Sequence, residues 1–182
     1  MSTESSFDSS SMPLKILCLH GGGETSITFR SQAGLVSLMN HLPDLEFVFA
    51  DAPSNSVWMQ DPPGGKGQPT TDPNWADKSI SYLDNLVSEQ GPFFGILGYS
   101  QGAAFIPVYL AKTSNSFNIA IMFNGYLPTT HHGLIETINS VAPIQTDSVL
   151  FVGDYDYHFR DLASDLANKF DSSQIVFSNE SG

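Results

Sequence analysis

Short apolar runs alternate with segments of helical periodicity along most of this chain. The apolar runs predict six strands, at 15–20, 46–52, 93–97, 118–123, 148–152 and 174–177. Helical spacing of apolar residues predicts helices at 31–42, 75–90, 134–141 and 161–170, with a further helix directly after residue 102. Because the strands are continuously apolar, both faces of the sheet must be covered. The pattern therefore predicts an α/β domain with a mostly parallel sheet and helices on both faces.

Three segments depart from this alternation. Residues 1–12 are polar and serine-rich, and are expected to be a disordered tail ahead of a single domain over 13–182. Residues 54–74 are a long loop rich in proline and glycine, which either roofs a pocket or is a surface excursion. Pro107 lies inside the helix that follows residue 102 and is expected to kink or shorten it.

The composition narrows the range of partners. Hydrophobic residues make up 41% of the 182 residues and charged residues only 14%, which suits one domain with a sizeable core. The 7 Lys and Arg residues are outnumbered by 19 Asp and Glu residues, which gives a net charge of −12. Such a surface repels phosphate groups and anionic lipids, so nucleic acid and membrane surfaces are not expected as partners.

Cysteine and histidine usage adds two expectations. The single cysteine, Cys18, lies in the first predicted strand, where it is expected to be a small core residue. No disulfide can form within the chain, and no signal peptide or membrane-spanning segment is recognised, so a cytoplasmic location is expected. The adjacent pair His131 and His132 lacks the spacing of metal ligands, so neither a metal nor another cofactor is predicted.

The strongest candidate for chemistry is Gly98-Tyr99-Ser100-Gln101-Gly102, a G-x-S-x-G motif. It stands between a predicted strand and an alanine-rich apolar segment, which is the strand–turn–helix context that a nucleophilic serine requires. The glycines let the backbone turn tightly enough to expose the hydroxyl of Ser100. The alternative interpretation is a glycine-rich turn in which the serine is incidental.

Two other predicted strands end in candidate functional residues. His20-Gly21-Gly22-Gly23 follows the first strand and matches neither a dinucleotide fingerprint nor a phosphate loop, since the third spaced glycine and the lysine are missing. Next to a nucleophilic serine, such glycines allow a backbone N–H to approach an oxyanion. Asp156 follows the fifth strand, with Asp154 as a rival. The carboxyl ends of parallel strands meet at one edge, so these segments are expected to converge on Ser100.

These motifs resemble the small serine hydrolases of the fungal FSH1 type, in the α/β-hydrolase superfamily. The resemblance covers nearly the whole chain after the tail, through the stretches 16–23, 29–32, 49–53, 98–103 and 153–156. It implies an α/β-hydrolase fold and a catalytic triad in the order Ser, Asp, His, with Ser100 as nucleophile and Asp156 as acid. It also implies an oxyanion hole formed by backbone N–H groups of Gly22 and Gln101.

The resemblance further implies a histidine just after the last strand. Here the sequence runs Ser178-Asn179-Glu180-Ser181-Gly182 without one, and none of the five histidines stands at the implied place. The chain is therefore expected to be truncated before the catalytic histidine. The alternative is a hydrolase-like fold with altered chemistry, for which His158, two residues from Asp156, is the substitute base.

The implied function is hydrolysis of an ester or thioester through an acyl-serine, on a small acyl or polyketide substrate of fungal secondary metabolism. His20 and the apolar loop residues Trp58 and Met59 are expected to contact that substrate. Two alternatives stay open. One is a polyketide-tailoring hydrolase that adds water to an epoxide or similar electrophile, although such enzymes usually carry aspartate at the position of Ser100. The other is a non-catalytic binding or partner subunit, and either a homo-oligomer or a hetero-oligomer is compatible with the sequence.

Overall fold

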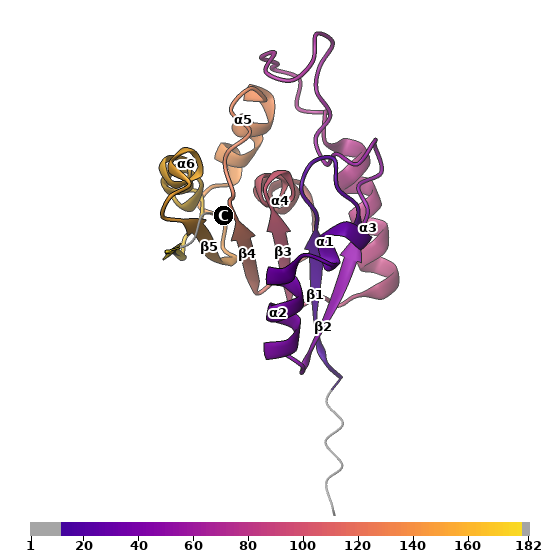
Figure 1. Cartoon of the computed structure of the whole chain (residues 1–182). Helices are drawn as coiled ribbons and strands as arrows, with labels where there is room; N and C mark the ends of the chain where they lie inside the picture. The colour runs from indigo at the N-terminus through magenta and orange to yellow at the C-terminus, as the bar shows by residue number, and fades with distance from the viewer. Residues whose placement is uncertain (1–11, 180–182) are drawn as a thin grey trace, which may run out of the picture.

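The computed structural model describes residues 12–179, which form a parallel sheet with helices on both of its faces (Figure 1). The expected tail falls on residues 1–12 and lies, apart from Met12, outside the described residues. Six strands pair in the order β2-β1-β3-β4-β5-β6, and all of the pairs are parallel. They are β1 (Leu14–Leu19), β2 (Leu45–Ala50), β3 (Gly95–Tyr99), β4 (Ile119–Phe123), β5 (Asp147–Gly153) and β6 (Ser173–Ser178). The sheet expected from the apolar runs is confirmed.

The helices follow the predicted order, with one additional helix and with ends that differ from the predicted ones by up to four residues. They are α1 (Ser26–Arg30), α2 (Ala33–His41), α3 (Asp77–Gln90), α4 (Gln101–Lys112), α5 (His132–Val141) and α6 (Tyr157–Ala167). The short α1 was not predicted, α5 begins at His132 rather than 134, and α6 begins at Tyr157 rather than 161. Across residues 12–179, no helix is both long enough and apolar enough to cross a membrane.

Pro107 was expected to kink or shorten its helix, and the expectation of a shorter helix is wrong, because α4 continues past it. The proline removes the backbone hydrogen bond that would reach the carbonyl of Ala103, yet the helix continues to Lys112. The helix survives because its residues from 102 to 109 are all buried, so packing against the sheet and neighbouring helices outweighs one missing hydrogen bond.

The two faces of the sheet are covered differently. Helices α3, α4, α5 and α6 bury one face in the larger core, which includes Trp58 and Phe105. On the other face α1 and α2 pack against β1, β2 and β3, where Cys18 is fully buried as expected and burial raises the pKa of its thiol. Further along this face, the stacked rings of Phe123 and Phe151 lie 4.9 Å apart and line an open apolar groove of about 540 Å³.

Gly98 controls how closely α4 approaches the sheet, which gives a test of this architecture. A Cβ atom at Gly98 would lie 2.6 Å from the backbone nitrogen of Ala103, so Gly98→Ala is expected to lower the free energy of unfolding by about 1–3 kcal/mol or more. Gly34 in α2 is the matched control, because nothing lies within 4 Å of a Cβ atom there. Gly34→Ala is expected to leave stability unchanged or raise it by up to about 1 kcal/mol. Urea unfolding followed by circular dichroism measures both, and equal effects would contradict the packing described here.

Candidate active site

Ser100 stands at the sharp turn between β3 and α4. Its backbone has φ 50° and ψ −114°, a conformation that costs a non-glycine residue free energy and is concentrated at functional sites. The N–H of Ser100 donates to the carbonyl of Phe123 at 2.9 Å, and this bond ties the turn to the end of β4. The side chain is half-buried and does not cap the helix. Ser100 therefore has the geometry of a nucleophile elbow.

The second glycine of the motif lets α4 cross β1 at close range. A Cβ atom at Gly102 would lie 2.6 Å from the carbonyl oxygen of His20, closer than any side chain tolerates. The N-terminus of α4 therefore packs against residues 20–23, the glycine loop, which follows β1. The positive end of the helix dipole lies near Ser100.

The glycine loop has its backbone donors almost fully used. The N–H of Gly21 donates to Glu24 Oε2 at 2.8 Å, and the N–H of Gly23 donates to the carbonyl of Ser56 at 2.8 Å. The N–H of Glu24 donates back to the carbonyl of Gly21 at 3.2 Å. Within the described part of the chain, the N–H of Gly22 has no hydrogen-bond partner, and the residue is exposed. Gly22 is therefore the donor in this loop that is available to a ligand.

Gln101 brings a second available donor next to Gly22. It is the first residue of α4, so its backbone N–H has no partner in the preceding turn. A Cβ atom at Gly22 would lie 3.4 Å from the side-chain Cδ of Gln101, which places the two residues in contact. The side chain of Gln101 is fixed by the N–H of Trp58, which donates to Oε1 at 2.8 Å, and by its own bond to the carbonyl of Met59.

His20, Trp58 and Met59 do not lie where substrate contact was expected. Their exposed fractions are 0%, 0% and 4%, so these side chains have almost no surface for a substrate to contact. His20 Nε2 accepts from the N–H of Ala52 at 3.0 Å, which requires the tautomer with the proton on Nδ1. In that tautomer Nδ1 donates to the carbonyl oxygen of Gly21, which lies 2.7 Å away. Trp58 Nε1 donates to the carbonyl of His20 at 2.8 Å. The structure thus corrects the expectation, because burial makes these residues supports of the glycine loop.

The long loop 54–74 lies between β2 and α3 in the chain and passes the start of α5. Its first part is anchored by Trp58, whose ring stacks on Phe105 of α4 at 5.6 Å. Its last part is anchored by the N–H of Thr70, which donates to the carbonyl of Thr130 at 2.9 Å. Figure 1 shows the loop rising beyond the carboxyl ends of the strands, on the side of the molecule where Ser100 lies.

Asp156 lies in the turn between β5 and α6, directly before the helix. Its N–H donates to the carbonyl of Gly153 at 3.0 Å, and the residue is half-buried. Ser100 and Asp156 follow strands that are separated by β4, so about two strand spacings of 4.8 Å, or roughly 10 Å, divide the two turns. A group that touches both residues must therefore bridge this gap, and an imidazole has the required role in a triad.

No described histidine bridges that gap by hydrogen bonds to Ser100 or Asp156. Both ring nitrogens of His20 are already bonded, and His41 bonds to the carbonyl of Ser37 at the end of α2. His131 is buried directly before α5, where burial lowers its pKa and its Nδ1 has no partner in the described residues. The side chain of His158 is outside the described part of the structure.

Sequence reasoning missed two acidic residues that hold the glycine loop. Glu24 binds Gly21, and its Oε1 also accepts from Gln32 Nε2 at 2.7 Å. Asp51 accepts from the N–H of Ser26 at 2.6 Å and from its hydroxyl at 2.7 Å, and these two bonds hold the pKa of Asp51 below its usual value. Asp51 lies in the stretch 49–53, which is part of the family resemblance. That resemblance was the only sign in the sequence that Asp51 has a role.

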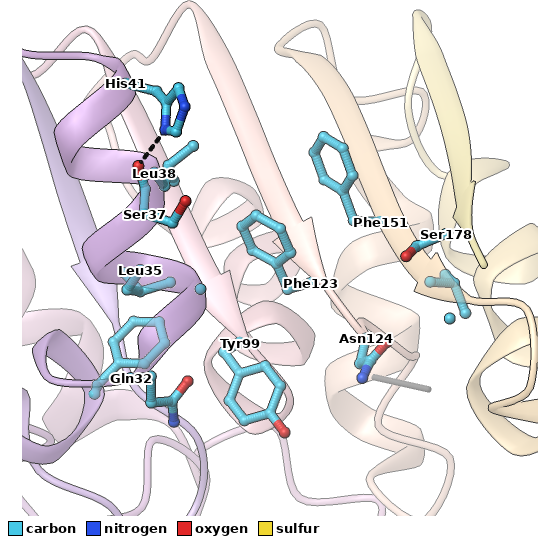
Figure 2. A pocket seen from close by; sticks show the side chains of 14 residues that line it. Gln32, Leu35, Ser37, Leu38, His41, Tyr99, Phe123, Asn124, Phe151 and Ser178 are labelled. Carbon is cyan, nitrogen blue, oxygen red and sulfur yellow. Dashed lines mark hydrogen bonds between the residues drawn. The ribbon is translucent and has the colours of Figure 1, made fainter. Parts of the chain in front are cut away.

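The groove on the α2 face reaches this edge of the sheet (Figure 2). Tyr99, the neighbour of Ser100, and Asn124, directly after β4, line the groove near this edge. Figure 2 shows the rings of Tyr99, Phe123 and Phe151 facing the groove opposite Leu35 of α2. The lining is mostly apolar, so the groove suits an apolar occupant better than a charged one.

Comparisons with known proteins identify the family and the fold. Among relatives, the rhodanese-like domain-containing protein 6 of Arabidopsis thaliana is 30% identical over 69% of this chain, and the esterase FPY3 of Fusarium mangiferae is 31% identical over 63%. This chain spans only 28% and 58% of their respective lengths. Among solved structures, esterase PE8 matches 92% of this chain and 83% of its own with a TM-score of 0.65 and 18% identity, which shows the shared α/β-hydrolase fold. The profile described as "Serine hydrolase (FSH1)" matches residues 10–182, and the chain therefore belongs to the FSH1 serine hydrolase family.

Proposed function

We propose that this chain carries the nucleophile, the oxyanion hole and the acid of a hydrolase that cleaves an ester or thioester through an acyl-serine. One observation carries the proposal. The strained turn presents Ser100 beside two adjacent residues, Gly22 and Gln101, whose backbone donors have no partner in the described part of the chain. A nucleophile beside two unused N–H groups is the arrangement that acyl transfer requires.

In this mechanism the hydroxyl oxygen of Ser100 attacks the carbonyl carbon of the substrate while a base accepts the hydroxyl proton. The carbonyl oxygen becomes an oxyanion that the N–H groups of Gly22 and Gln101 stabilise, with help from the dipole of α4. Collapse of this tetrahedral intermediate breaks the bond to the alcohol or thiol, which leaves with a proton from the base. Water then attacks the acyl-serine in the same way and releases the acid.

The base of this mechanism is proposed to be a histidine that the described side chains do not include. The gap of roughly 10 Å between the turns of Ser100 and Asp156 leaves room for an imidazole. Ser178, at the end of β6, pairs with Gly153 and accepts from the N–H of Asp154 at 2.7 Å. Residues that follow Ser178 are therefore attached next to the turn that carries Asp156, which supports a base from that segment.

The substrate is proposed to be a small acyl or polyketide ester or thioester. The mostly apolar groove beside Tyr99 and Asn124 supports an apolar acyl group. Relatives described as esterases occur in the fungi Fusarium mangiferae and Aspergillus niger, and also in Caenorhabditis elegans and Danio rerio. The setting in fungal secondary metabolism and the cytoplasmic location are proposed from the family resemblance and the composition.

Replacement of Ser100 tests the nucleophile directly. In the full-length protein encoded by the gene, Ser100→Ala is expected to lower ester hydrolysis by about 10³-fold or more, because no other group forms the acyl intermediate. A fluorophosphonate probe is expected to add its mass to the peptide that contains Ser100. Ser114→Ala replaces an exposed serine and is the control. This variant is expected to hydrolyse the ester, and to be labelled on Ser100, as the wild type is. Hydrolysis that survives Ser100→Ala would favour direct addition of water, as in the epoxide alternative.

Asp156 and Asp154 can be separated by the same assay. Asp156→Asn is expected to lower kcat by about 10²–10⁴-fold, because an amide holds the imidazole in the wrong tautomer and does not stabilise its charged form. Asp154→Asn removes an equivalent charge two residues away and is expected to change kcat by less than about threefold. A larger loss for Asp154→Asn than for Asp156→Asn would assign the acid to Asp154.

A further inference from the structure

We propose that Glu24 is a positioning residue of the oxyanion hole, which holds the glycine loop so that the N–H of Gly22 stays available to the substrate. This inference rests on the proposed function. Glu24 touches neither the substrate nor Ser100 in the mechanism above, and it acts through the backbone of the loop.

The carboxylate of Glu24 bridges two groups that belong to different parts of the chain. Oε2 accepts from the N–H of Gly21 at 2.8 Å, and Oε1 accepts from Nε2 of Gln32, between α1 and α2, at 2.7 Å. Glu24 is half-buried, so water competes less for these bonds than it would at an exposed carboxylate. The loop is thereby fastened to the helical segment that follows it.

The bond to Gly21 determines which donor of the loop is left over. Gly23 is held by the carbonyl of Ser56, and Gly21 is held by Glu24. The N–H of Gly22 belongs to the same peptide group as the carbonyl of Gly21, which is bonded to His20 Nδ1 and to the N–H of Glu24. With Gly21 and Gly23 also fixed through their own N–H groups, the N–H of Gly22 points to no acceptor in the described residues. The carboxylate of Glu24 holds the preceding peptide, through the N–H of Gly21. Successive glycines have great conformational freedom, so loss of this anchor lets the loop shift and displaces the N–H of Gly22.

The charge of Glu24 acts against the reaction while its hydrogen bonds favour it. A full negative charge near the loop repels a developing oxyanion. A positioning role therefore requires the acceptor oxygen and not the charge. Glutamine at this place offers Oε1 to Gly21, and the amide of Gln32 can turn over to offer its own oxygen to the new NH₂ group. Glu24→Gln separates the two effects, and Glu24→Ala removes both.

The experiment compares variants of the full-length protein by ester hydrolysis and by the rate of fluorophosphonate labelling of Ser100. Glu24→Ala is expected to lower kcat and the maximal labelling rate by about 10–100-fold with KM changed less than about threefold, because the oxyanion forms only in the transition state. Glu24→Gln is expected to stay within about threefold of the wild type. Glu136→Ala, at an exposed carboxylate on α5, is the matched control and is expected to have no effect.

Thermal unfolding of each variant separates positioning from general stability, because a merely structural role would lower the folded fraction without changing kcat per folded molecule. If Glu24→Ala does not fold, Gln32→Ala removes the other end of the bridge and is expected to lower kcat by a few-fold, on the order of 2–10. Equal losses for Glu24→Gln and Glu24→Ala, or no loss for Glu24→Ala, would overturn the inference. Wild-type protein in which Ser100 does not react would instead refute the proposed function, and the inference would fail with it.

Discussion

The close crossing of α4 over β1 and β3 is the constraint on which the arrangement at the carboxyl edge of the sheet depends. It exists because two positions carry no side chain: a Cβ atom on Gly98 or Gly102 would collide with backbone atoms of the opposite element. The crossing forces the strained backbone of Ser100 and places Gln101 against Gly22. The burial of α4 from 102 to 109 supplies the packing that offsets this local strain.

The glycine loop is held by segments that are distant in sequence. His20 is bonded to Ala52 after β2, Gly23 to Ser56 of the long loop, and Ser26 to Asp51. The end of β2 therefore contributes nothing to the proposed chemistry and yet determines the shape of the loop that does. This explains why a stretch such as 49–53 can belong to a family pattern without a catalytic residue.

The strands and the serine turn could be predicted because their signals are local. A continuously apolar run predicts a buried parallel strand, and G-x-S-x-G between such a run and an apolar helix predicts the elbow. The anchors could not be predicted in the same way. The buried positions of His20 and Trp58 depend on two hydrogen bonds, one between residues 32 positions apart and one between residues 38 positions apart. No local sequence pattern predicts contacts at such separations.

Local signals also misled at two places. Pro107 suggested a kinked or shortened helix, and the shortening does not occur, because propensity rules describe isolated helices and not one buried on most of its surface. The short α1 was missed because it has few apolar residues, although Thr25 and Thr28 form a reciprocal cap at its start. That cap is written in the sequence as Thr-x-x-Thr, a weaker form of the usual Ser/Thr-x-x-Glu signature.

The bonds from Ser26 to Asp51 have a consequence for acidic conditions. Because they lower the pKa of Asp51 in the folded chain, their stabilisation is complete above the ordinary aspartate value of about 4 and is lost as the pH falls through the lowered value. Asp51 is exposed, so its protonation requires no global unfolding. Acid would therefore loosen the start of α1, and with it one side of the glycine loop, while the sheet beneath stays folded.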